Sequence, residues 1–89
     1  MPHIIVNHEV KDYGRWRPYF DDHARVRREF GCLGEQVFRD ANNPNSITVL
    51  MEWDSFENAD RFLNESNLSE VMENAGVISQ PSVSFVNET

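Results

Sequence analysis

The segment from Asn7 to Gly31 constrains the fold most strongly, because its apolar residues change from strand-like to helix-like spacing within a few positions. Residues 3–10 alternate between two faces, and both faces carry apolar residues, which predicts a strand that is at least partly covered on both sides. From residue 12 onward large side chains recur at helical spacing, at Trp16, Phe20, His23, Arg27 and Phe30. The sequence therefore predicts a strand that leads directly into a long amphipathic helix.

The ends of this helix carry recognisable signals. Asp12 can accept hydrogen bonds from the free amides of the first turn, and Gly31 suits the left-handed position that ends many helices. Pro18 would remove one hydrogen bond inside the helix. We therefore expect either a kink at Pro18 or a regular helix that begins near it.

The rest of the chain continues this alternation. Residues 33–40 and 46–53 predict two strands, separated by turn-forming residues at 41–45. Two capping-box patterns predict two further helices: Asp54 with Glu57, and Asn67 with Glu70. A last strand is expected at residues 82–86. The order β-α-β-β-α-(α)-β predicts an α+β fold of the ferredoxin-like type, a sandwich in which helices cover one face of a four-stranded antiparallel sheet, with residues 1–89 as one domain.

The second face of this sheet would be bare in a monomer, although it also carries apolar side chains. A chain of 89 residues buries only about 60–65% of its unfolded surface, so covering that face would stabilise it considerably. We therefore expect a homodimer that packs sheet against sheet, which is a dimeric α/β barrel.

Composition disfavours several classes of partner. The chain has 8 basic and 15 acidic residues and a net charge of −7, which repels nucleic acids and anionic membranes. It has no apolar run of about 20 residues to span a bilayer. Cys32 is the only cysteine and no signal peptide is evident, so we expect a cytoplasmic protein. The three histidines lack metal-ligand spacing, and we expect neither a metal nor another cofactor.

Several runs of the sequence resemble small proteins of the dimeric α/β-barrel superfamily. The resemblance is narrowest to a cyclase-like branch related to the antibiotic-biosynthesis monooxygenase domain. It covers nearly the whole chain and rests on six runs: His8–Trp16, Phe20–Asp21, Phe38–Arg39, Pro44–Asn45, Leu50–Asp54 and Ala75–Val77.

This resemblance implies a pocket between the helices and the sheet of each subunit. Members of the superfamily include cofactor-free monooxygenases and cyclases of polycyclic aromatic polyketides, haem-degrading enzymes and stress-related proteins. The haem-degrading members use an asparagine, a tryptophan and a helical histidine. Asn7 and Trp53 stand at comparable places here, but residues 56–75 contain no histidine, so we do not expect haem degradation.

Two residues at the junction of strand and helix are the catalytic candidates. His8 could act as a general base that draws a proton from a phenol or an enol, and Tyr13, together with Asn7, could orient an oxygenated substrate. The alternative is that His8 only holds this junction together by a hydrogen bond. Five further residues are candidates for binding a small aromatic ligand, although the aromatic ones could equally be core: Asn7, Trp16, Phe20, His23 and Trp53.

The arginines at positions 25, 27 and 28 are interpreted as a solvated helix face, with Asp21 paired to Arg25. The leading hypothesis is therefore a small-molecule protein, a cofactor-independent monooxygenase or cyclase. The rival is a non-catalytic ligand-binding or dimerisation module of unknown, stress-related role. An enzyme would have an open pocket with convergent polar groups, whereas a pure module would fill that space with Trp16, Phe20 and Phe62.

Overall fold

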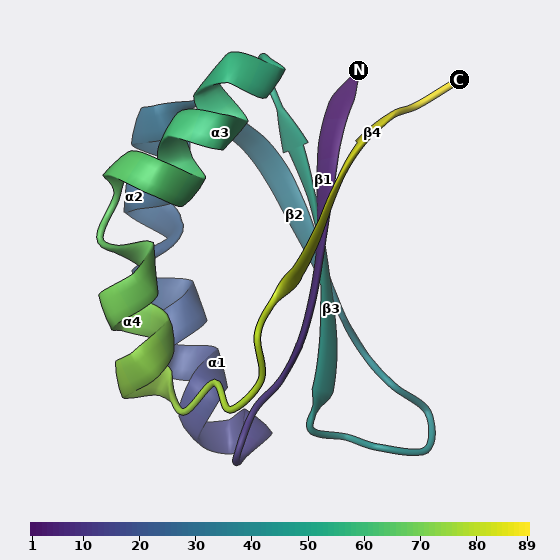
Figure 1. Ribbon diagram of the computed structural model, residues 1–89, viewed down its shortest axis with the longest axis vertical. Helices are drawn as coiled ribbons and strands as arrows, with labels where there is room; N and C mark the ends of the chain where they lie inside the picture. The colour runs from purple at the N-terminus through teal and green to yellow at the C-terminus, as the bar shows by residue number, and fades with distance from the viewer.

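A computed structural model describes residues 1–89 and confirms the ferredoxin-like α+β fold (Figure 1). The elements follow one another along the chain as β1 (Pro2–Glu9), α1 (Tyr13–Asp22), α2 (Ala24–Phe30), β2 (Cys32–Arg39), β3 (Ser46–Trp53), α3 (Phe56–Glu65), α4 (Leu68–Ala75) and β4 (Ser82–Asn87). No helix has the length and apolar character that crossing a membrane requires.

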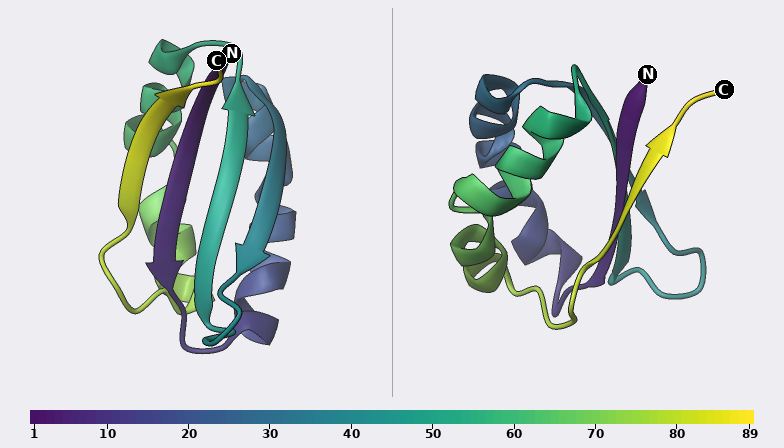
Figure 2. Two further views of the ribbon diagram at one scale, coloured as in Figure 1. Left: turned by 90° about the vertical axis from the view of Figure 1, so that its right-hand side faces the viewer. Right: turned by 45° about the horizontal axis from the view of Figure 1, so that its top comes forward.

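The four strands form one antiparallel sheet in the order β2-β3-β1-β4. Figure 2 shows all four helices on one face of this sheet, and its left panel shows the other face uncovered. The register places Val37, Val49, Val6 and Val83 side by side across the sheet. Because alternate residues point to opposite faces, this row faces the helices together with His8, two residues after Val6.

The helix layer consists of two broken columns. α1 and α2 form one column and α3 and α4 form the other, with α1 beside α4 and α2 beside α3 (Figure 1). The first column breaks at His23 and the second at Ser66 and Asn67. Both breaks therefore lie near the middle of the layer, over the centre of the sheet.

The sequence predicted a kink or a helix start at Pro18, but the break in the first helix column lies at His23. α1 continues through Pro18, which leaves the carbonyl of Gly14 without its helical partner. Gly14 is exposed, so water can satisfy that carbonyl. The helix ends instead at His23, whose side chain bonds to Asn67 of the other column.

The helix caps were predicted in part. Asp12 accepts a hydrogen bond from the Gly14 amide, as expected, and Gly31 ends α2 with a φ of 113°. At α3 the prediction was wrong by one residue. Ser55 is the N-cap and accepts from the Asn58 amide, while Asp54 accepts from the Asn58 side chain.

The core lies between the helices and the inner face of the sheet. β3 supplies alternate buried residues from Ile47 to Trp53, as its pattern predicted. Trp53 and Phe62 are the largest fully buried side chains and pack with ring centroids 5.2 Å apart. This packing fixes α3 on the sheet and leaves the space nearer α1 and α4 for a cavity.

Candidate functional site

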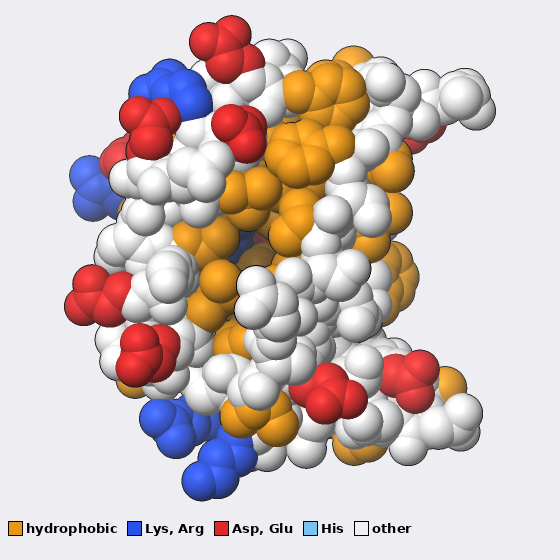
Figure 3. Space-filling view, viewed as in Figure 1, with side chains coloured by type: hydrophobic (Ala, Val, Ile, Leu, Met, Phe, Trp, Pro, Cys, Tyr) orange, Lys and Arg blue, Asp and Glu red, His pale blue; other side chains and the backbone are white.

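A cavity of about 70 Å³ lies between the helix layer and the inner face of the sheet. Of its 17 lining residues, 13 are hydrophobic, so the cavity is suited to an apolar or aromatic ligand. The space-filling view shows it as a hollow with an apolar surround, opening between the α3–α4 column and β4 (Figure 3).

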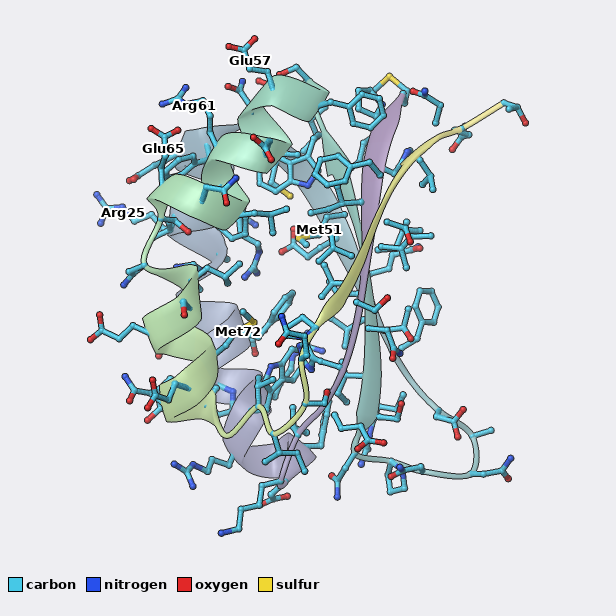
Figure 4. All side chains as sticks on the ribbon, in the orientation of Figure 1. Arg25, Met51, Glu57, Arg61, Glu65 and Met72 are labelled. Atoms are coloured by element: carbon cyan, nitrogen blue, oxygen red, sulfur yellow. The ribbon has the colours of Figure 1, made fainter.

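Two flexible side chains line the cavity from opposite layers. Met51 projects from β3 and Met72 from α4, and both contribute to the wall (Figure 4). Val83 and Pro81 line it from the region of β4. Methionine side chains adapt readily to the shape of a bound molecule, so the cavity can adjust to a ligand.

His8 is the polar group that β1 contributes to the cavity wall. Its side chain is 4% exposed, and its Nδ1 atom has no hydrogen-bond partner. Burial lowers the pKa of His8 below its usual 6.5, because the charged imidazolium would lose its hydration. The imidazole is therefore neutral at pH 7 and able to accept a proton.

Three further side chains continue from His8 along one wall. The Trp16 ring lies 5.6 Å from His8 in an edge-on arrangement, and Phe20 stacks on Trp16 at 4.9 Å. The guanidinium of Arg27 lies 3.8 Å from the centre of the Phe20 ring. All four residues line the cavity. We call the row formed by His8, Trp16, Phe20 and Arg27 the aromatic ladder.

His23 lies beside the ladder at the break of the first helix column. It is 6% exposed, lines the cavity and places Nε2 at 3.0 Å from Oδ1 of Asn67. Its ring also contacts Phe62, with centroids 5.6 Å apart. The sequence left open whether His23 is a core residue or a ligand-binding residue. His23 is packed in the core and also lines the cavity.

Arg27 is a site residue that its sequence context does not indicate, because the neighbouring arginines favour a solvated face. It is only 3% exposed and pairs with Glu35 at 3.2 Å. The predicted pair of Asp21 with Arg25 is also wrong: Asp21 bonds Arg17, and Arg25 bonds Glu29. The available signal was position, because Arg27 shares the helical spacing of Trp16, Phe20, His23 and Phe30.

Asn7 does not line the cavity. It is exposed on the opposite face of the sheet, where its Nδ2 donates to Ile47 O and Thr48 Oγ1. Neighbouring strand residues point to opposite faces, so Asn7 and His8 cannot both face one pocket. The expectation that these two residues act together on a substrate is corrected here.

Tyr13 and Trp53 also lie outside the cavity lining. Tyr13 accepts a hydrogen bond at 3.3 Å from Arg17, and the Arg39 guanidinium lies 4.0 Å from the centre of its ring. Trp53 is fully buried in the core, and its Nε1 has no partner. The structure therefore brings His8, Trp16, Phe20 and His23 together around the cavity. Tyr13 packs against Trp16 with ring centroids 6.0 Å apart, but neither Tyr13 nor Trp53 lines the cavity.

The remaining reactive side chains do not form a second site. No three His, Cys, Asp or Glu side chains are grouped so that they could hold a metal ion. Burial raises the pKa of the Cys32 thiol, which keeps it protonated and unreactive.

Known proteins resemble this chain in sequence and in fold. Residues 14–74 match the family model described as antibiotic biosynthesis monooxygenase. No protein with a curated functional description matches the chain. A crystal structure described as antibiotic biosynthesis monooxygenase has a TM-score of 0.76 at 17% identity, covering 100% of this chain and 99% of the other.

Two further solved structures have the same fold. One is described as a putative antibiotic biosynthesis monooxygenase from Bordetella bronchiseptica, with a TM-score of 0.72 and 20% identity over 99% of this chain and 96% of the other. The other is SnoaB, described as a cofactor-independent oxygenase from Streptomyces nogalater. It has a TM-score of 0.75 and 14% identity over 99% of this chain and 94% of the other.

Proposed function

The chain belongs to the antibiotic biosynthesis monooxygenase family, and from this premise we propose that it is a cofactor-independent monooxygenase of a small aromatic or polyketide-like substrate. The substrate would occupy the cavity between the helices and the sheet. SnoaB, a structure with the same fold, is described as a cofactor-independent oxygenase, which supports this choice of reaction.

The observation that carries the proposal is the state of His8. It is a buried, neutral imidazole with an unpartnered nitrogen in the wall of an apolar cavity. A buried polar group without a partner costs stability, and such groups persist where function requires them. A neutral histidine with a lowered pKa is suited to accept a proton from a weakly acidic phenol or enolisable ketone.

The reaction needs no external reductant when the substrate supplies the electrons. His8 removes a proton from the CH₂ group of an enolisable aromatic ketone, and the resulting electron-rich anion reacts with O₂. One oxygen atom replaces the two hydrogens as a new carbonyl group, and the other leaves with those hydrogens as water. The carbon of the CH₂ group loses four electrons as it becomes the carbonyl carbon, and these four electrons reduce both atoms of O₂, so atoms and electrons balance.

The apolar wall assists this chemistry. Few water molecules compete in such a cavity, so a charged intermediate interacts strongly with the few polar groups present. Trp16, Phe20 and Phe62 surround the space without filling it. That arrangement favours the pocket over the packed module considered as the rival.

The test compares His8→Gln with His3→Gln, using anthrone as the probe and oxygen uptake as the readout. The His8 variant should lose about 100-fold or more of the rate, the usual contribution of a positioned base. His3 bonds only Met1 O near the terminus, and its variant should retain the rate. Full activity of His8→Gln would exclude His8 as the base. A wild type that binds anthrone without oxygen uptake would favour a non-catalytic binding protein.

A cyclase would begin with the same proton transfer, so it is the closest alternative reaction. In that case the enolate carbon attacks a carbonyl group of the same molecule, and a carbon–carbon bond forms without O₂. Product formation under nitrogen distinguishes the two reactions, because only the cyclase would continue.

We also propose that the protein is a homodimer formed through the uncovered face of the sheet. Ile5 and Leu50 are partners at the centre of that face, and Phe38, which pairs with Thr48 on the same face, is 51% exposed. An exposed apolar sheet face of this kind is typical of a protein interface. The cavity lies on the opposite face, so such a dimer would leave its mouth open.

A further inference from the structure

Arg27 has N–H groups that the protein does not use. Nη1 donates to the Phe20 carbonyl at 2.8 Å, and Nη2 donates to Glu35 at 3.2 Å. Each of these two nitrogens carries a second N–H group without an acceptor, and Nε is buried and has none either. A charged group that is 3% exposed normally has all of its donors satisfied. The unused N–H groups of this cavity-lining residue therefore indicate a missing acceptor.

The chemistry of the missing acceptor follows from the charges near Arg27. Glu35 compensates the guanidinium charge and is not itself a lining residue. The cavity therefore presents a cation with a carboxylate behind it, which attracts a full anion only weakly. A neutral carbonyl oxygen that becomes negative during the reaction suits such a donor better, because the interaction strengthens as charge develops.

The aromatic ladder places His8 and Arg27 at opposite ends of one wall. Trp16 and Phe20 lie between them in successive ring contacts. A planar ligand that lies in the cavity along the edges of these rings would present one end to His8 and the other to Arg27. In a conjugated ketone, a proton removed at one end of the ring system leaves negative charge on the oxygen at the other end.

We propose that Arg27 binds the substrate oxygen and stabilises the oxyanion that forms there when His8 removes a proton from the far end of the same conjugated system. This inference rests on the proposed function and adds an oxyanion-binding residue to it. It requires that the acidic position and the oxygen lie at opposite ends of one conjugated system.

The test uses 4-nitrophenol, whose yellow phenolate can be titrated by absorbance while it is bound. A cation beside the phenolate lowers the pKa of the bound phenol, typically by about one unit or more. The bound pKa should therefore be higher in Arg27→Gln than in the wild type. Glu35→Gln should change it in the opposite direction, because it removes the compensating negative charge and keeps the guanidinium.

Two variants serve as controls. Arg25→Gln, on the same helix with a side chain 89% exposed, should leave the bound pKa unchanged. If Arg27→Gln does not fold because Glu35 is left unpaired, the double variant Arg27→Gln/Glu35→Gln removes both charges and should still raise the bound pKa. An equal bound pKa in the wild type and in the Arg27 variants would overturn the proposal, as would failure of the wild type to bind 4-nitrophenol.

The outcome for Arg27 can be separated from the outcome for the monooxygenase. Oxygen uptake with anthrone reports the reaction, whereas the phenol titration reports oxyanion binding without any turnover. If the wild type shifts the phenol through Arg27 but consumes no oxygen, the monooxygenase proposal fails and the oxyanion site stands. If the enzyme is active, Arg27→Gln should lower kcat by about 100-fold, the effect of removing one oxyanion donor.

Discussion

Nε2 of His23 lies 3.0 Å from Oδ1 of Asn67, and this hydrogen bond joins the breaks of the two helix columns. His23 ends α1, and Asn67 precedes the first residue of α4. The bond spans 44 positions of sequence and lies beside the cavity. This hydrogen bond therefore holds the two helix columns together at the level of the cavity, where a ligand would bind.

Replacing Asn67 by Ala should lower the free energy of unfolding by about 1 kcal/mol, since the buried His23 ring loses its partner. Asn67→Ser should cost about as much, although serine is a good N-cap, because the Asn67 side chain makes no capping bond. Asn64→Ala, at an exposed residue of α3, should change the free energy of unfolding by less than about 0.5 kcal/mol. Urea unfolding of the four proteins measures these differences. If Asn67→Ser were as stable as the wild type, residue 67 would contribute to stability as an N-cap and not through the bond to His23.

His8 should make stability depend on pH in a defined direction. Its pKa is lowered in the folded protein from the usual 6.5, so between the two values the unfolded chain binds more protons. Stability therefore rises with pH in that window. The contribution of neutral His8 is complete above pH 6.5 and is lost as the pH falls toward the folded-state value. Urea unfolding across this range, with His8→Leu as reference, isolates the effect.

The same variant should separate stability from activity. His8→Leu removes a buried nitrogen that has no partner, so at neutral pH it should be as stable as the wild type or more stable by up to about 2 kcal/mol. It should nevertheless lose turnover. A variant that unfolds more easily at neutral pH would mean that the His8 ring has a structural role at the junction.

Gly31 and Gly34 form a matched pair for a test of backbone conformation. Gly31 has a φ of 113°, and a Cβ there would collide with the Asp54 carboxylate, whereas a Cβ at Gly34 meets nothing within 4 Å. Gly31→Ala should lower the free energy of unfolding by about 2 kcal/mol or more, and Gly34→Ala by less than about 0.5 kcal/mol. Thermal and urea unfolding compare them directly. Similar losses of stability in the two variants would show that Gly31 is not required for its left-handed conformation.

The fold was predictable because its signals are local. Alternation in residues 46–53 gave β3 with the correct ends, and Gly31 marked the end of α2 as expected. Periodicity and turn residues act within a few positions, so they can be read without knowledge of the tertiary structure. The break at His23 was not predictable, because it coincides with a hydrogen bond to a residue far along the chain.

The site was predictable only in part. His8, Trp16, Phe20 and His23 follow strand and helix periodicity and do line the cavity. Arg27 follows the same helical spacing, but a charged residue among other arginines was interpreted as solvated. Its burial depends on Glu35 of the neighbouring strand, a pairing that composition and spacing cannot show.

The proposed dimer gives the remaining prediction. Leu50 faces the uncovered side of the sheet at its centre, where a second copy would bury it. Leu50→Glu should weaken dimerisation by about 100-fold or more, because the interface would lose apolar area and gain unpaired charges. Ile78→Glu, in the loop before β4 at a residue 64% exposed, should leave the dimer intact.

Native mass spectrometry of freshly purified protein measures this assembly and any retained small molecule together. The wild type and Ile78→Glu should appear as dimers, and Leu50→Glu as a monomer that keeps the fold, because Leu50 lies outside the core between sheet and helices. An extra mass retained by all three would place the ligand in the cavity, which each subunit forms by itself. A wild-type monomer at micromolar concentration would contradict the sheet-to-sheet dimer, and retention of ligand by that monomer would still support the cavity as the binding site.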